Sequence, residues 1–337
     1  MNNTLSKIYI LDAVRGVAAM IVALYHFIHF SNHHGSLFDE KATILKTVDP
    51  FLHGSICVFF IISGYVIFLH LERNGYRIQN YGIFLWKRIL RMHLPLSICL
   101  LLIVVVNTVF QSYLGLATEV DPGRLLANIT LTASFFDYEW YNPIFWTLSI
   151  EFQFYLVIGI LFSLLQKRPS VALISTGLVL IPLNYIGNHT SYFDTTPYLV
   201  HFGSYFLIGI GMYLFHQKRF SAFQLSVLIA IGAIDCFLGQ PDYYYVLPFL
   251  TIPIMLFVKS RFRLLELSGE VSYSFYLMHG MFGGWFLYFT ARYADQTWEK
   301  IGLIILALLI SYAGSYPFYK LIEKSSFRLS RNIKYKK

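Results

Sequence analysis

The sequence carries little charge. Only 13% of its 337 residues are Asp, Glu, Lys or Arg, whereas 56% are hydrophobic. A soluble globular chain usually has about a quarter charged residues, so this chain has too few of them to cover a water-facing domain. The lipid bilayer is the solvent that suits such a composition. The net charge of +8 does not indicate a nucleic-acid partner, because the basic residues are scattered over short loops and do not gather on one polar face.

Cysteine is scarce as well, and its placement argues against a metal site. The three cysteines, Cys57, Cys99 and Cys236, lie in apolar runs and have no spacing typical of metal ligands. We therefore expect them to be buried small hydrophobic residues and expect no bound metal.

We also find no cleavable signal peptide. The first apolar run begins near Tyr9, contains Asp12, Arg15 and His26, and is not followed by a small-residue cleavage site. This run predicts a retained first membrane span.

Apolar stretches of about 20 residues, the length that a helix needs to cross a bilayer, recur along the whole chain. Strands of a membrane barrel would be shorter and would alternate in polarity. The sequence therefore predicts an all-α integral membrane protein with about ten transmembrane helices. The expected spans are residues 8–30, 50–71, 92–112, 144–165, 171–188, 197–216, 221–238, 243–258, 270–291 and 300–321.

The distribution of Lys and Arg between the loops predicts the orientation. With ten spans, twenty basic residues fall on the side of both termini, five fall on the opposite side, and Arg15 lies inside the first span. Cytoplasmic loops carry the excess of positive charge, so both termini are expected in the cytoplasm. We expect one membrane domain over residues 1–325, a basic cytoplasmic tail over residues 326–337, and no appended soluble domain.

Ionisable residues inside a span are costly and are functional candidates by default. Arg15 and His26 are eleven residues apart, which is about three helical turns, so they share one face of the first span at a separation of roughly 16 Å. Asp12 lies one turn before Arg15 and can pair with it. A cation near the cytosol and a histidine deeper in the membrane suit a tunnel with an anionic ligand and a general base. The alternative is that Arg15 reaches the headgroups and His26 bonds a neighbouring helix.

Two further ionisable residues fall inside expected spans. Glu151, about one turn inside the fourth span, lies near the expected depth of His26 and is a candidate to orient its imidazole; the alternative is that it only ties helices together. His279 is expected to be a structural hydrogen-bonding residue and not a second base.

The basic loop before the third span is a candidate phosphate site. It contains Arg73, Arg77, Lys87, Arg88 and Arg91. Arg88 and Arg91 are three residues apart and share a helical face, and Arg side chains match phosphate oxygens. The alternative is charge that sets topology beside anionic lipid.

The long outer loop over residues 113–143 is acidic and aromatic, which is typical of a sugar-binding surface or of an interfacial aromatic belt. The adjacent His33 and His34 are expected to lie in a solvated loop, since successive side chains rarely converge on a metal.

Four motifs, in order, resemble the acyltransferase family 3 of integral membrane acyltransferases, which commonly O-acetylate surface polysaccharides and related glycans. They are RGVAAMIVALYH (15–26), FFIISGY (59–65), WTLSIEFQFY (146–155) and SYSFYLMH (272–279). KRILRMHLP (87–95) is similar to the family's basic entry to the third span, although its proline falls one residue further on.

The resemblance implies a cytosolic acyl-CoA donor, most commonly acetyl-CoA, and a glycan or lipid-linked saccharide acceptor on the far side of the membrane. It implies that His26 is the essential histidine, that Arg15, Arg88 and Arg91 contact the donor, and that Ser63 lines the tunnel; the alternative for Ser63 is helix packing with Gly64. No permanently bound cofactor is expected, and the expected location is a bacterial inner membrane among its lipids. The expected catalytic residues are His26, Arg15 and Glu151, and the expected supporting residues are Asp12, Trp146, Tyr273 and His279.

The expected mechanism is direct transfer, with His26 as the base that activates a sugar hydroxyl; an acyl-histidine intermediate is the rival route. Two other functions stay open on the residues alone. A multi-pass transporter or glycolipid flippase would use the same intramembrane charges without consuming a thioester. A scaffold of a polysaccharide machine would not need His26.

Overall fold

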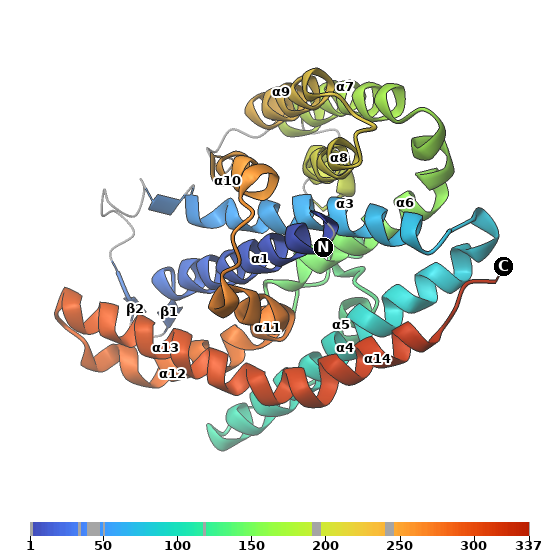
Figure 1. Cartoon of the computed structure of the whole chain (residues 1–337). Coiled ribbons are helices and arrows are strands. Elements are labelled where there is room, and N and C mark those ends of the chain that lie inside the picture. The colour runs from blue at the N-terminus through green and yellow to red at the C-terminus, as the bar shows by residue number, and fades with distance from the viewer. Residues whose placement is uncertain are drawn as a thin grey trace.

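The computed structural model describes residues 3–32, 35–38, 48–49, 51–116, 119–190, 197–239 and 246–336 of the chain. This part is helical apart from a short antiparallel ribbon in which β1 (Ser31–Asn32) pairs with β2 (Gly35–Ser36) (Figure 1). The long helices are α1 (Asn3–Ile28), α3 (Ser55–Arg73), α4 (Tyr81–Tyr113), α6 (Phe145–Lys167), α7 (Pro169–His189), α8 (Leu199–His216), α9 (Ala222–Gly239), α10 (Val246–Phe257), α11 (Arg263–His279) and α13 (Thr297–Phe318). The short helices are α5 (Pro122–Ile129), α12 (Trp285–Thr290) and α14 (Lys324–Asn332).

The all-helical membrane fold expected from the sequence is confirmed in its main feature. Eight helices in the described ranges are long and apolar enough to cross a bilayer. The other two expected spans correspond to α10, an apolar helix of only 12 residues, and to a segment in which α11 passes through a π turn at Gly280–Gly284 into α12. The count of ten spans and the cytoplasmic location of the termini stay predictions.

The centre of the bundle is formed by α3 and α8, whose apolar stretches are 78% and 72% buried, against 33% for α7 and 28% for the segment that contains α13. Glycines allow α3 and α8 to pack backbone against backbone. A Cβ at Gly64 would collide with the carbonyl of Phe206, and one at Gly209 with the carbonyl of Ile61. Small residues at such crossings are the usual means of close helix packing in membranes.

The most extensive helix pair, α1 with α11, is packed in the same way. A Cβ at Gly16 would collide with the Ser268 hydroxyl oxygen, and one at Gly269 with the carbonyl of Asp12. This crossing lies beside Arg15, so the packing fixes the position of the arginine relative to α11.

The third span starts earlier than expected. We predicted residues 92–112, but α4 begins at Tyr81 and runs through Pro95 to Tyr113. Proline removes only one backbone donor from the helix, and neighbouring helices compensate for such a loss in a membrane. Arg88 and Arg91 therefore lie inside the helix.

Residues 324–336 lie against this N-terminal half of α4. After a π turn at Tyr319–Glu323, α14 packs along α4, and the Ser330 hydroxyl donates to the Lys87 carbonyl at 3.0 Å. The boundary expected at residue 325 thus falls within a helical segment. In Figure 1 the C-terminus lies at the end of the bundle where α3 passes into α4. Arg73, Arg77 and Lys87 belong to this connection and the start of α4, so we refer to this end as the basic end.

The three cysteines are buried and free, as expected. No cluster of His, Cys, Asp or Glu that could hold a metal ion occurs among the residues that the structure describes.

Candidate active site

His26 lies near the end of α1 that is remote from the basic end, and its ring stacks on that of His279. The two ring centroids are 5.4 Å apart with an interplanar angle of 30°. Neither ring nitrogen of His26 has a hydrogen-bond partner in the described part of the chain. The alternative that His26 bonds a neighbouring helix therefore has no support there, and both nitrogens are free to meet a ligand.

His279 closes α11 and is held by the backbone. Its Nδ1 lies 2.7 Å from the carbonyl oxygen of Tyr276, and only 1% of its surface is exposed. Because a carbonyl only accepts, Nδ1 carries the ring proton and Nε2 is left as an acceptor. These contacts fit the expected structural role, with the additional finding that the fixed ring forms a wall for His26.

Arg15 lies further along α1, at its crossing with α11. Its guanidinium donates to the Gly269 carbonyl at 2.7 Å and lies 3.6 Å from the Asp12 carboxylate, which is the pairing that the spacing predicted. The Nε of Arg15 is buried and has no acceptor among the described residues. The arginine is thus positioned by two contacts but still has a donor left for a ligand.

Glu151 does not contact His26, so the expected role in orienting the imidazole has no geometric basis. Its carboxylate accepts a hydrogen bond from Ser63 at 2.9 Å and another from the hydroxyl of Tyr155. The physical reason is the packing order: α3 packs against both α1 and α6, and Glu151 on α6 points to the α3 side. Glu151, Ser63 and Tyr155 form a polar bridge between α3 and α6.

Tyr155 connects this bridge to Arg88. The guanidinium of Arg88 lies beside a pair of aromatic rings, 5.5 Å from the centroid of Phe84 and 5.7 Å from that of Tyr155. Arg88 is only 3% exposed, yet no hydrogen-bond acceptor for its guanidinium occurs in the described ranges, and its Nε is buried without a partner. Burying a cation without an acceptor is costly, so such a group marks a place for an anion.

Arg91, Tyr273 and Trp146 each make a separate contact with a neighbouring helix. The guanidinium of Arg91 lies 5.1 Å from the ring of Phe327 on α14. The hydroxyl of Tyr273 donates to the carbonyl of Met92 at 2.8 Å and so ties α11 to α4. Trp146 packs against Phe202 at 5.5 Å between ring centroids.

The sequence analysis missed two residues of this region. Glu323 accepts from both the amide and the hydroxyl of Ser274 and lies within electrostatic range of Arg15 and Arg91. Glu323 lies just beyond the expected tenth span, residues 300–321. A single carboxylate directly after an apolar run could have identified it as a candidate. Tyr155 follows Glu151 by four residues, so helical spacing alone would have paired them.

The outer loop is ordered mainly by its own polar contacts. Asp121 caps α5 by accepting from the amide of Gly123 at 2.7 Å, and Arg124 donates to the Glu139 carbonyl at 3.0 Å. Phe136 is 66% exposed, so the loop presents an aromatic side chain at the surface. The contacts of the loop favour neither a sugar-binding site nor an interfacial aromatic belt. His33 and His34 lie outside the described residues.

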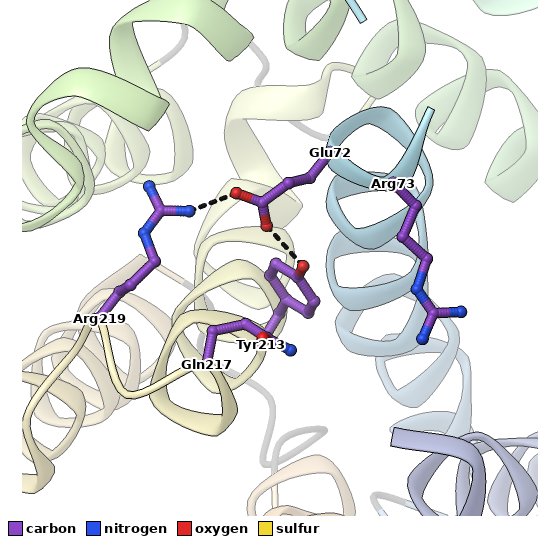
Figure 2. A pocket seen from close by; sticks show the side chains of 5 residues that line it. All are labelled: Glu72, Arg73, Tyr213, Gln217 and Arg219. Atoms are coloured by element: carbon purple, nitrogen blue, oxygen red, sulfur yellow. Dashed lines mark hydrogen bonds and ion pairs between the residues drawn. The ribbon is translucent and has the colours of Figure 1, made fainter. Parts of the chain in front are cut away.

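A surface cavity of about 360 Å³ lies near the basic end, between α3 and α8. Figure 2 shows that Glu72 there contacts both Arg219 and Tyr213, while Arg73 points away from it. The carboxylate neutralises the cation within the cavity. An anionic ligand is better placed at Arg88, which has no carboxylate in hydrogen-bond contact in the described part of the chain, although Glu151 lies within electrostatic range of it.

The apolar helices of the described ranges, with a few buried polar groups between them, define a multi-pass membrane protein. The family model described as "Acyltransferase domain" matches residues 8–320. The chain belongs to this family, acyltransferase family 3, and it is an acyltransferase.

Relatives with a curated name support the assignment. The chain is 25% identical over 311 residues to "O-acetyltransferase OatA" of Staphylococcus aureus strain NCTC 8325 / PS 47, and equally to those of strains COL and MRSA252. The match covers 79% of this chain and 51% of each relative, so the chain spans about half the length of the curated relatives that it matches. No solved structure matches the chain.

Proposed function

We propose that this membrane O-acyltransferase moves an acyl group, acetyl in the first instance, from acyl-CoA at the basic end to a sugar hydroxyl of a cell-surface or exported glycan. The observation that carries the proposal is the free His26 imidazole at one end of α1, combined with unpartnered arginine nitrogens on Arg15 and Arg88. The relatives' printed name, O-acetyltransferase, supports the choice of acetyl.

The reaction balances with His26 as the only proton carrier. The imidazole removes the proton from the sugar hydroxyl, and the resulting alkoxide attacks the thioester carbonyl. The carbon–sulfur bond breaks, the ester forms on the sugar, and the imidazolium returns the proton to the CoA thiolate. His279 stacks against one face of the His26 ring, which helps to align the imidazole with the sugar hydroxyl.

Binding of acyl-CoA requires cationic side chains near its phosphate groups. Arg88 supplies a buried guanidinium without a competing acceptor, and Arg91 follows it on the same face of α4. Arg15, on α1 between the basic end and His26, would bind the more distal part of the donor or the oxyanion. The bacterial inner membrane, with the donor on its cytoplasmic side, is the proposed location.

The test uses membrane vesicles that contain the protein, acetyl-CoA labelled in the acetyl group, and a glycan extract from a host that lacks the enzyme. We expect label to enter a base-labile ester on the glycan, with release of one free CoA thiol per ester formed. Movement of the glycolipid across the membrane without thioester consumption would instead support a flippase and contradict the proposal.

A further inference from the structure

The C-terminal segment (residues 333–336) is fastened to the start of α4 by a set of specific contacts. The buried Asn80 side chain donates to the Lys336 carbonyl at 3.0 Å and accepts from the Lys336 amide at 2.9 Å. The Lys87 ammonium donates to the Ile333 carbonyl at 2.8 Å. This end of the chain is thus held in one place beside the basic end.

The segment places Tyr335 beside His70 and Lys87. The Tyr335 ring lies 6.5 Å from the His70 ring and 5.0 Å from the Lys87 ammonium, and it is within electrostatic range of Arg88. Its hydroxyl is buried and has no hydrogen-bond partner among the described residues. Burial raises the pKa of Tyr335 above its ordinary value, although Arg88 opposes this, so the hydroxyl stays protonated and can donate.

Besides Arg88 Nε and the Tyr335 hydroxyl, His70 Nε2 is a buried donor without an acceptor among the described residues. The amide nitrogen of Asn74 lies 3.4 Å from His70 Nδ1 and can only donate, so Nδ1 accepts and the proton lies on Nε2. That Nε2 is buried and unpartnered in the part of the chain that the structure describes, and His70 is within electrostatic range of Arg88.

Three buried donors without an acceptor, namely Arg88 Nε, His70 Nε2 and the Tyr335 hydroxyl, therefore lie in one neighbourhood. Protein interiors rarely leave such groups unpaired, and donors without acceptors match the oxygens of an anion. We propose that Tyr335 and His70 complete, with Arg88, a binding site for a phosphate group of the acyl donor, and that the C-terminal segment is a wall of this site. The inference rests on the proposed use of acyl-CoA.

The test compares Tyr335→Phe, which removes only the hydroxyl, with Tyr113→Phe, which alters an 86% exposed tyrosine at the far end of α4. The affinity of the full-length protein in nanodiscs for CoA is measured by calorimetry, together with the thermal midpoint. Because a hydrogen bond to a charged group is lost, we expect CoA to bind about tenfold more weakly to Tyr335→Phe and unchanged to Tyr113→Phe. Adenosine 3′,5′-bisphosphate and inorganic pyrophosphate, tested alone, identify which phosphate is held.

A second variant keeps the hydroxyl but releases the segment. Asn80→Ala removes both contacts to Lys336, so we expect weaker CoA binding with Tyr335 intact. A lower thermal midpoint with unchanged CoA affinity in both variants would make the segment purely structural and overturn the inference, while wild-type acetyl transfer would leave the proposed function standing. If the wild-type protein neither binds CoA nor consumes acetyl-CoA, the proposed function and the inference fall together.

Discussion

The rings of His26 and His279 stack at 5.4 Å between centroids, and the Nδ1 of His279 is fixed to the backbone carbonyl of Tyr276. A backbone hydrogen bond fixes the ring of His279, whereas both ring nitrogens of His26 remain available to a substrate. We therefore expect His279→Gln to disturb the alignment of His26 without removing the base. Transfer should fall by about tenfold in kcat while the KM for acetyl-CoA stays the same. A loss as complete as that in a His26 variant would show that His279 itself carries the proton.

Glu151 bonds Ser63 and Tyr155 and does not lie beside His26. We therefore expect it to have little effect on the pH dependence of acetyl transfer. In Glu151→Gln the pH profile of kcat/KM should move by less than about half a unit, because no charge next to His26 is removed. The measurement is the acid limb of the profile in vesicles. A clear downward shift of that limb would indicate that Glu151 stabilises the imidazolium after all.

The same bridge has a predicted coupling energy. A double-mutant cycle of Ser63→Ala and Glu151→Gln, read by thermal unfolding in detergent, should give a coupling of about 1 kcal/mol, in the range of hydrogen bonds between membrane helices. Among the residues that the structure describes, Ser175 bonds only within its own helix, so Ser175→Ala serves as the control partner for Glu151. Strict additivity of Ser63→Ala and Glu151→Gln would contradict the hydrogen bond.

Arg88 is expected to bind the donor and not merely to set topology. Arg88→Gln should raise the KM for acetyl-CoA by about tenfold or more with a smaller change in kcat, because a charge-assisted contact to phosphate is lost. The exposed Arg77, changed in the same way, is the matched control for the effect of loop charge on topology. Equal KM values in the two variants at equal membrane levels would favour the topological role.

The α1–α11 crossing is expected to tolerate no side chain. Gly269→Val should lower the thermal midpoint by about 5 °C or more or prevent folding, since a Cβ there meets the Asp12 carbonyl. Gly302→Val, at a position with open space around it, controls for the substitution itself. A normal midpoint for Gly269→Val would mean that the two helices do not pack as described.

Sequence reasoning reached those parts of the site that lie on one helix. The spacing of Asp12, Arg15 and His26 fixed their shared face, because helical periodicity is set by the backbone. It left open which helix Glu151 faces, because the depth of a side chain in the membrane does not determine its neighbouring helix. Contacts between distant segments, such as Tyr335 beside His70, depend on how the end of the chain docks and have no local signal.

The most direct test of the central claim is single-turnover acetyl transfer by His26→Asn, compared with the wild type and with His189→Asn at equal folded protein. His189 is exposed on α7, and within the described ranges its side chain bonds the Tyr185 carbonyl alone, so it controls for loss of an imidazole. We predict that His26→Asn loses transfer by about 10²–10⁴-fold while it still binds CoA, and that His189→Asn retains the wild-type rate. Wild-type transfer by His26→Asn would contradict the assignment of His26 as the base.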